Sequence, residues 1–206
     1  MPTLYHWWRS SSSWRVRWAL ELKGVKADLV LVNLMTGENE QPAHLARNPM
    51  GYVPVLALDG RNMIESMAIL EYLDETHPSP RLIPGDAYDR QHVRALSELI
   101  NAGTQPIHNV DVFEHHSADP EEQKRWNAHF IRRGLKAFEK LASPRAGAFA
   151  FGNQVTAADL CLVPQCFAAA RFGVDVAAEF PLVARWNAAS LATPECQASH
   201  PDRYKP

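Results

Sequence analysis

A run of four serines between a strand-like and a helix-like segment constrains the fold of this sequence most strongly. The run, Ser10–Ser13, follows the aromatic-rich segment Leu4–Trp8, whose composition favours a β-strand. The residues after the run have the i, i+3, i+4, i+7 spacing of one helix face, at Val16, Ala19, Leu20 and Lys23. The serines are therefore expected on a turn from a strand into a helix.

The serine run can do more than start a helix. Serine is a favoured N-cap, because its oxygen accepts a hydrogen bond from an otherwise unpaired backbone N–H. One serine would suffice for that role, whereas four hydroxyls at the positive end of a helix, flanked by Arg9 and Arg15, are suited to binding an anion. The local pattern leaves a plain polar turn open as the alternative.

The composition disfavours several classes of protein. The net charge of −2 gives no electrostatic basis for binding nucleic acid. No segment approaches the roughly 20 apolar residues of a membrane-spanning helix, and the first residues lack a signal-peptide pattern, so we expect a cytoplasmic protein without membrane contact. The three cysteines do not suggest a disulfide framework, and the nine histidines show no metal-binding spacing.

The first 80 residues alternate between strand and helix patterns. A second apolar, β-branched segment covers residues 27–32, and a polar loop follows it. Two further strand-like segments flank the pair Asp59-Gly60, which predicts a β-hairpin. A helical pattern then starts at Ser66. The order β-α-β-loop-β-β-α predicts a small mixed sheet with helices packed on it.

The second half of the chain shows only helical patterns. Residues 78–87 contain three prolines and one glycine, as in a linker. Helical spacing of apolar residues follows in four segments, over residues 88–116, 120–142, 157–172 and 181–192. We therefore expect two domains: residues 1–80 with the mixed sheet, and residues 86–206 made of helices alone.

Two short motifs of the first domain contain residues with a possible role in ligand binding. Pro54 stands at the start of a predicted strand, where proline is confined to an edge or a bend, and X-Pro bonds are where cis peptides occur. An edge proline is the simpler interpretation. Ser66 can cap its helix and offer the helix N–H groups to a carboxylate, while Glu65 can hold an ammonium group. The pair would suit the α-amino acid end of a ligand, although a serine cap alone is common.

Together these motifs are similar to the cytosolic glutathione transferases over essentially the whole chain, and most of all to their zeta class. The run Arg9–Arg17 resembles the zeta-class signature Ser-Ser-Cys-x-Trp-Arg-Val-Arg. Further matches to that class lie at Asn48–Pro54, Gln105–Asn109, Ala158–Gln165 and Arg171–Phe172. The zeta class includes maleylacetoacetate isomerase and the related maleylpyruvate isomerases.

The resemblance implies a fold and a cofactor. The fold is α/β plus all-α, with a thioredoxin-like N-terminal domain and an all-helical C-terminal domain, and the cofactor is glutathione. In the family, the proline matching Pro54 is cis, and the backbone of the residue matching Val53 pairs with the cysteinyl part of glutathione. The residues matching Glu65 and Ser66 hold the γ-glutamyl end. Further glutathione contacts match Asn39, Gln105 and Asn109, and a helix-capping motif matches Thr156 and Asp159.

The resemblance also implies a reaction, the cis–trans isomerisation of a maleyl keto acid to its fumaryl form in the catabolism of tyrosine and other aromatic compounds. Rotation requires that the π bond be broken, and a thiolate can do this by adding to the alkene and leaving after rotation. Hydroxyl donors and a helix N-terminus would lower the pKa of the thiol, and Ser10 is the first candidate donor, before Ser11 and Ser12. Arg9 and Arg171 are the candidates for binding the dicarboxylate substrate.

One departure from the signature and two alternatives bear on this interpretation. Ser12 stands where the family has cysteine, which disfavours reductive and thiol-exchange activities. A general glutathione transferase or peroxidase would combine the same glutathione site with an apolar pocket, against which Arg9 and Arg171 count. A non-enzymatic binding module would not need the serine run or the Glu65-Ser66 pair. The family further implies a homodimer.

Overall fold

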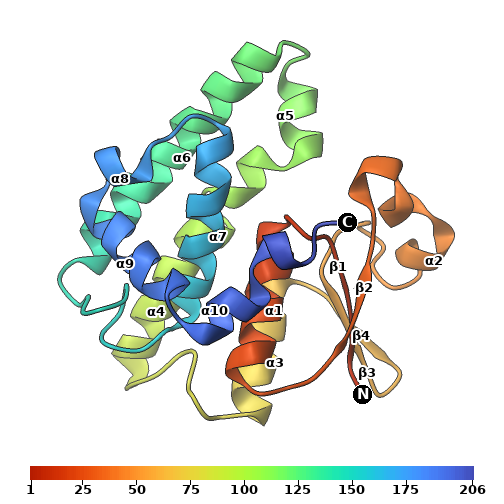
Figure 1. Cartoon of the computed structure of the whole chain (residues 1–206), viewed down its shortest axis with the longest axis horizontal. Helices are drawn as coiled ribbons and strands as arrows, with labels where there is room; N and C mark the ends of the chain where they lie inside the picture. Colours follow the sequence, from red (N-terminus) through yellow and green to blue (C-terminus); the bar gives the residue numbers. More distant parts are fainter. The chain divides into compact units, whose positions relative to one another are not determined.

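The computed structural model describes residues 1–206 (Figure 1), which divide into two compact units. Unit 1 comprises residues 1–82 and 194–206, and unit 2 comprises residues 83–193. Unit 1 holds all the strands of the sheet, and unit 2 is helical. This is the combination of a small mixed sheet and a helical region that the sequence predicts.

Unit 1 is built on a four-stranded sheet in the order β2-β1-β3-β4. The strands are β1 (Thr3–His6), β2 (Asp28–Leu31), β3 (Val55–Leu58) and β4 (Arg61–Met63). β1 runs parallel to β2 and antiparallel to β3, and β3 pairs in turn with β4. A parallel pair requires a crossover connection, which contains helix α1 (Ser11–Leu22). The predicted mixed sheet is confirmed.

The hairpin between β3 and β4 turns on Asp59 and Gly60, as predicted. Both residues have positive φ, 50° and 75° respectively. A two-residue turn needs this combination to match the right-handed twist of the strands that it joins. Strand pairing accordingly begins directly beside the turn, between Leu58 and Arg61.

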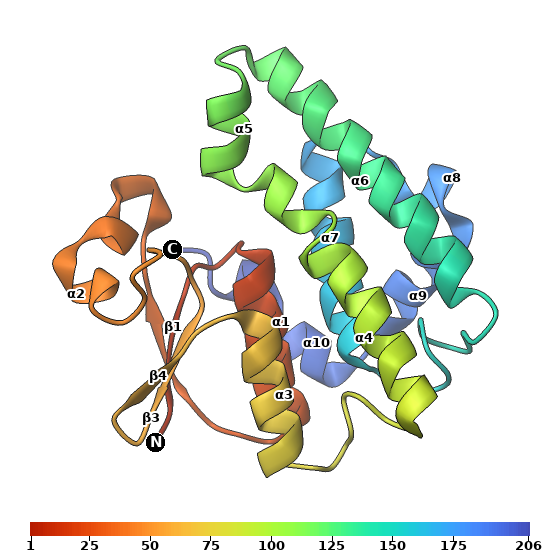
Figure 2. The same ribbon diagram turned by 180° about the vertical axis from the view of Figure 1, so that it is seen from behind.

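Helices α1 and α3 (Ser66–Thr76) lie side by side on one face of the sheet (Figure 2). Between β2 and β3 the chain forms two 3-10 helices, Leu34–Thr36 and Glu38–Glu40, and the short helix α2 (Pro42–Leu45). The core of unit 1 consists of buried side chains from the central strands and from α1 and α3, including Leu4, Leu56, Trp14, Trp18, Ile69 and Leu70.

Unit 2 consists of helices packed around α7. Its helices are α4 (Ala87–Asn101), α5 (Val110–His116), α6 (Pro120–Ala142), α7 (Ala157–Arg171), α8 (Val176–Glu179) and α9 (Pro181–Leu191). Twelve of the fifteen residues of α7 are buried, as expected for a helix that is apolar on nearly every side. None of the helices of the chain combines the length and the apolar character needed to cross a membrane.

The sequence predicts one continuous helix over residues 88–116, and this prediction is wrong because the structure divides the segment. The structure ends α4 early and places a 3-10 helix (Gln105–His108) before α5. Thr104 has a non-helical φ of −132°, and its hydroxyl donates to the Leu99 carbonyl oxygen at 2.9 Å, which closes the end of α4. Pro106 then removes a backbone N–H from the next turn. The prediction used apolar spacing alone and gave no weight to these two residues.

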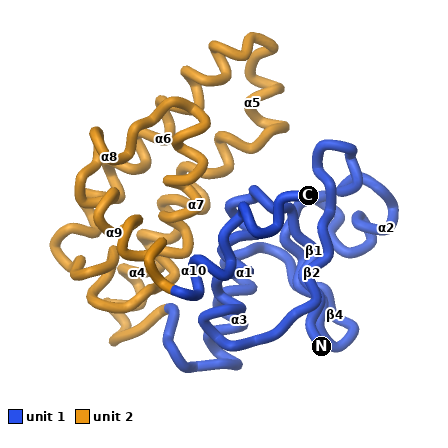
Figure 3. The backbone as a smooth tube through the Cα atoms, in the orientation of Figure 1, with its two compact units in different colours: residues 1–82, 194–206 blue, residues 83–193 orange.

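The C-terminal segment belongs to unit 1 (Figure 3). It forms α10 (Pro194–Ser199), which packs against α1, and a 3-10 helix (Pro201–Arg203). Trp14 of α1 donates from Nε1 to Ser199 Oγ at 3.1 Å. Unit 2 therefore ends before α10, whereas the sequence predicted one helical domain over residues 86–206.

Gly134 of α6 packs against Thr104, the residue that closes the end of α4. A Cβ at this position would overlap Thr104 Oγ1. We predict that Gly134→Ala lowers the free energy of unfolding by about 1–3 kcal/mol, opposite to the usual gain from replacing a helical glycine. Denaturant unfolding measures the change. In the double variant with Thr104→Ala the two losses should be less than additive, and strictly additive losses would contradict this cause.

Candidate active site

Two of the four serines hold the turn from β1 into α1. Ser10 is the N-cap of α1, with an extended backbone (φ −65°, ψ 123°), and its Oγ accepts from the Ser13 N–H at 3.2 Å. The fully buried Ser13 accepts in turn, through its Oγ, from the Trp7 N–H at 3.3 Å. The predicted strand-to-helix turn and its serine cap are confirmed, and Ser13 closes the turn from its inner side.

Ser11 and Ser12 form the first turn of α1 and are partly buried. Since α1 is twelve residues long, its aligned peptide dipoles give this first turn a partial positive charge. Arg9 precedes the turn, and its Nη2 lies 3.4 Å from Met35 Sδ. Hydroxyl groups, a helix N-terminus and a guanidinium group thus occur together, and these are the groups that an anion site uses.

Val53 and Pro54 lie against this turn. Their peptide bond is cis, as the family resemblance implies. Val53 shares one core cluster with Trp7 and Val32. Val53 is only 9% exposed, and no hydrogen bond within the chain uses its main-chain N–H or C=O. Buried main-chain groups are nearly always paired, so this pair of groups is suited to an extended ligand backbone.

The Glu65-Ser66 pair starts α3, but not in the predicted way. Glu65 takes the N-cap position without a side-chain capping bond, and Ser66 is the first helical residue. The prediction of a serine cap is wrong because the Ser66 hydroxyl accepts from Arg15 Nη1 instead, at 3.2 Å. Glu65 has a φ of 64°, in a region that residues with a Cβ rarely adopt and that costs of the order of 1–3 kcal/mol. Such strain is concentrated at ligand-binding positions.

Arg15, which the sequence places beside the serine run, has a second role that the sequence did not predict. Its side chain is fully buried, and its bond to Ser66 joins the serine turn to the start of α3. The signal was present in the sequence, because the segment Trp14–Leu20 is otherwise apolar and contains two arginines but no acidic residue. A buried guanidinium must find hydrogen-bond acceptors on neighbouring elements.

Asn39 lies in the connection between β2 and β3 and supports the segment that leads to Val53. Its Nδ2 donates to the Gly51 carbonyl oxygen at 3.0 Å. Gly51 has a φ of 70°, and a Cβ there would lie 3.3 Å from the Asn39 carbonyl oxygen, so this close approach favours glycine. The contact of Asn39 with glutathione stays a prediction.

The remaining predicted site residues, Gln105, Asn109 and Arg171, lie in unit 2. Gln105 Nε2 donates to Asn109 Oδ1 at 2.9 Å. The ring of His108, between them in the chain, lies 5.8 Å from the ring of Phe172. Arg171 is the exposed last residue of α7, with its guanidinium carbon 5.3 Å from the same phenyl ring. The end of α7 and the 3-10 helix before α5 therefore meet at the Phe172 ring.

His108 was missed by the sequence analysis, although it lies within the Gln105–Asn109 motif. Its Nε2 is 2.9 Å from Oε1 of Gln165, a fully buried side chain of α7. This bond anchors the 3-10 helix that carries Gln105 to the central helix of unit 2. Its only signal in the sequence was its place in the motif.

Thr156 and Asp159 form the helix-capping pair that the resemblance implies. The buried Asp159 carboxylate accepts from the N–H and from the hydroxyl of Thr156, both at 2.9 Å, and from the Ala150 N–H at 2.9 Å. Burial raises the pKa of Asp159 to about 6, although these hydrogen bonds oppose the rise. The pair has a structural role at the start of α7.

Comparisons with known proteins define the class to which this fold and site belong. The model of the glutathione S-transferase N-terminal domain matches residues 2–75, and that of the glutathione S-transferase C-terminal domain matches residues 121–189. The chain therefore belongs to the glutathione S-transferase family.

Within this family the chain is similar to maleylacetoacetate isomerases. The maleylacetoacetate isomerase of Rhizobium meliloti (strain 1021) is 45% identical over 208 aligned positions, and the alignment covers 98% of this chain and 97% of that protein. The similarity thus extends over both units.

Two solved structures share the fold across nearly the whole chain. One is the maleylacetoacetate isomerase of Anaeromyxobacter dehalogenans 2CP-1 with bound dicarboxyethyl glutathione and citrate in the active site. It is 45% identical with a TM-score of 0.89, covering 98% of this chain and 95% of that one. The other is a maleyl pyruvate isomerase described as a bacterial zeta-class glutathione S-transferase. It is 37% identical with a TM-score of 0.93, covering 97% of this chain and 96% of that one.

His6, at the end of β1, is a buried titratable group beside the serine turn. It is 1% exposed, and Arg17 Nη1 lies 3.0 Å from its Nδ1. Because a guanidinium can only donate, Nδ1 must accept and the ring must be neutral. Burial, and then the charge of Arg17, lower the pKa of His6 to about 3.

We predict that His6 makes the folded protein sensitive to acid. The unfolded chain takes up a proton on this residue near its ordinary pKa of 6.5, whereas the folded chain does so only at about 3. The free energy of unfolding should therefore fall as the pH drops from about 6.5 toward 3, by up to about 5 kcal/mol from this group. Denaturant unfolding at a series of pH values measures it.

His6→Gln is the matched variant, because glutamine offers Arg17 a neutral acceptor that does not titrate. The variant should lose most of this pH dependence. Asp159 acts in the opposite direction, since its raised pKa makes stability fall as the pH rises from about 4 to 6, but it contributes equally to both proteins. If the free energy of unfolding of His6→Gln depends on pH as strongly as that of the unmodified protein, His6 is not the cause of the dependence.

Proposed function

We propose that this chain is a glutathione-dependent cis–trans isomerase that converts a maleyl keto acid, maleylacetoacetate or maleylpyruvate, into its fumaryl isomer. The observation that carries the proposal is the junction of three features in unit 1. The serine turn packs through Trp7 against Val53 of the cis peptide, and α1 reaches Ser66 through Arg15. The similarity to maleylacetoacetate isomerases supports the same reaction.

The polar groups of unit 1 suit glutathione. Its γ-glutamyl end carries an ammonium group and a carboxylate on one carbon, which the Glu65 carboxylate and the start of α3 complement in charge. Because the Ser66 hydroxyl accepts from Arg15, its own proton is left for donation to a carboxylate. The unpaired main-chain N–H and C=O of Val53 suit the cysteinyl backbone. Further contacts are assigned to Asn39, Gln105 and Asn109.

The serines act on the sulfur. When bound, glutathione supplies the thiolate that adds to the double bond of the acid and leaves after rotation. The hydroxyls of Ser10, Ser11 and Ser12 and the positive end of α1 stabilise the thiolate and so lower the pKa of the thiol. Ser10 is the first candidate donor, because its oxygen accepts from the Ser13 N–H while its own proton is not used in that bond.

The substrate is a dicarboxylate, so the site must supply cations. Arg9 beside the serine turn and Arg171 at the end of α7 are assigned to its carboxylates, through charge-assisted hydrogen bonds. The relative from Anaeromyxobacter dehalogenans binds dicarboxyethyl glutathione and citrate, both of which carry several carboxylates. Ser12 in place of the family cysteine favours addition and elimination over thiol exchange.

The proposal extends to the setting of the reaction. We infer a cytoplasmic homodimer that acts in the catabolism of tyrosine and other aromatic compounds, because maleyl keto acids arise from the cleavage of aromatic rings. The resemblance to dimeric cytosolic glutathione transferases supports the dimer and the compartment. The three cysteines are free and buried, which agrees with a reducing compartment.

The test is turnover of maleylacetoacetate and of maleylpyruvate with and without glutathione, followed by the loss of absorbance of the cis enone. We expect turnover that requires glutathione and leaves its amount unchanged. No glutathione-dependent turnover would refute the isomerase. Activity toward a chlorinated aromatic electrophile, with none toward the maleyl acids, would establish a general transferase instead.

Single substitutions distinguish the serines. Ser10→Ala should lower turnover by about 100-fold, the usual effect of removing one donor to a developing negative charge. Ser13→Ala is the matched control. It leaves the buried Trp7 N–H without its acceptor and should cost about 1–3 kcal/mol of stability, with a much smaller loss of turnover. Equal losses of turnover would show that Ser10 is not the donor.

A further inference from the structure

Arg17 of α1 is a buried cation whose hydrogen-bond acceptors are all neutral. Its side chain is 2% exposed. Nη2 donates to the Trp8 carbonyl oxygen at 2.9 Å, Nη1 to the Trp7 carbonyl oxygen at 3.4 Å and to His6 Nδ1 at 3.0 Å, and Nε to the Ser199 carbonyl oxygen at 3.2 Å. Burial lowers the pKa of Arg17 to about 10, so the group is still charged at neutral pH.

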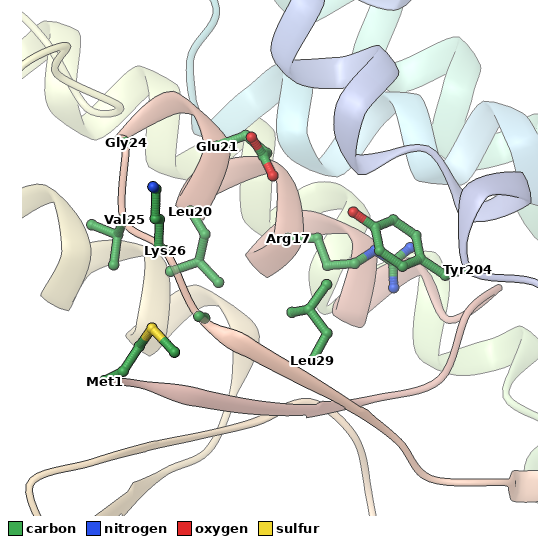
Figure 4. A pocket seen from close by; sticks show the side chains of 10 residues that line it. Met1, Arg17, Leu20, Glu21, Gly24, Val25, Lys26, Leu29 and Tyr204 are labelled. Atoms are coloured by element: carbon green, nitrogen blue, oxygen red, sulfur yellow. The ribbon is translucent and has the colours of Figure 1, made fainter.

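One guanidinium thereby joins the turn before α1 to the C-terminal segment. Ser199 lies 182 positions after Arg17 in the chain. The ring of Tyr204 lies beside the guanidinium (Figure 4), with 4.8 Å between the guanidinium carbon and the ring centroid. Tyr204 Oη donates to the Ala198 carbonyl oxygen at 2.9 Å, which fixes the ring within its own segment. Lys205 Nζ adds a contact 5.8 Å from the centroid of the Trp8 ring.

The guanidinium group is needed here for its shape as well as its charge. A buried charge without a carboxylate partner is costly, and several charge-assisted hydrogen bonds must offset that cost. Arginine presents five N–H groups in one rigid plane, so it can serve carbonyls on two different segments at once. The ammonium group of lysine carries the same charge but cannot reproduce this arrangement.

The bond to Trp8 sets the direction of the chain at the candidate active site. In a planar trans peptide the C=O and N–H point in opposite directions, so holding the Trp8 oxygen toward Arg17 turns the Arg9 N–H away from it. Ser10 follows at once as the cap of α1. The placement of the assigned substrate cation and of the first thiolate donor therefore depends on Arg17.

We propose that Arg17 is a positioning residue of the glutathione site, and that Ser199 and Tyr204 of the C-terminal segment hold its guanidinium in place. The inference rests on the proposed binding of glutathione by unit 1. It gives the C-terminal segment a part in the active site, although the segment lies at the far end of the sequence from the serine turn.

A pocket beside Arg17 makes a conservative test possible. The pocket has a volume of about 480 Å³, and its lining includes Leu20, Glu21, Lys26 and Tyr204 (Figure 4). None of the predicted site residues lines it. A shorter lysine at position 17 would have room and solvent nearby, so Arg17→Lys should fold and keep the charge while losing the planar array of donors.

The experiment compares Arg17→Lys with Arg203→Lys, which changes an exposed arginine of the C-terminal segment in the same way. Three quantities are measured: the pKa of the bound glutathione thiol from thiolate absorbance, KM for glutathione, and hydrogen exchange of the amides of residues 8–12 without glutathione. For Arg17→Lys we expect a thiol pKa higher by about one unit, a KM about ten-fold higher and exchange about ten-fold faster. For Arg203→Lys we expect no change.

Tyr204→Leu is the second variant, and it should move the same three quantities in the same direction by a smaller factor. If Arg17→Lys fails to fold, this variant decides the question. A folded Arg17→Lys with unchanged exchange and unchanged thiol pKa would overturn the inference. If the unmodified protein does not bind glutathione, the proposed function fails, and the exchange measurement still decides whether Arg17 holds the turn.

Discussion

Two buried guanidinium groups on α1 hold the candidate site of unit 1 together. A charge removed from water must be met by hydrogen-bond acceptors, and Arg15 and Arg17 find theirs on other elements. Arg15 reaches Ser66 at the start of α3, and Arg17 reaches the carbonyl of Trp8 in the turn before α1. Since Trp7 of the same turn packs against Val53, the cis peptide becomes part of the same framework. Helix α1 thus organises each part of the anion site that lies in unit 1.

The features that sequence reasoning predicted correctly depend on short-range rules. The serine cap of α1, the Asp59-Gly60 hairpin and the Thr156-Asp159 pair are each decided within a few residues, where backbone geometry leaves few options. The mixed sheet was predicted from the order of the strand and helix patterns in the first 80 residues. The family resemblance then identified the cis Pro54, for which the local sequence offered only a weak statistical preference.

The features that it could not predict depend on contacts between distant segments. Amphipathic spacing shows that a helix has a buried face, but not which surface covers it. For this reason the sequence predicts residues 194–199 as part of the helical domain, although the hydrogen bond from Trp14 to Ser199 joins α10 to α1. The Ser66 hydroxyl was predicted to cap its own helix, because nothing nearby in the sequence shows that Arg15 takes it. Hydrogen bonds between segments so far apart in the sequence can be identified only from the folded structure.

Unit 1 is proposed to bind glutathione and to ionise its thiol. Calorimetric titration at neutral pH, repeated in buffers of different ionisation enthalpy, gives the number of protons released on binding. A free thiol with a pKa of about 8.5 is mostly protonated at this pH, so ionisation in the site should release close to one proton per glutathione. S-methylglutathione has no thiol proton and should bind without this release. Binding of glutathione with no more proton release than its S-methyl derivative would show that the site does not ionise the thiol.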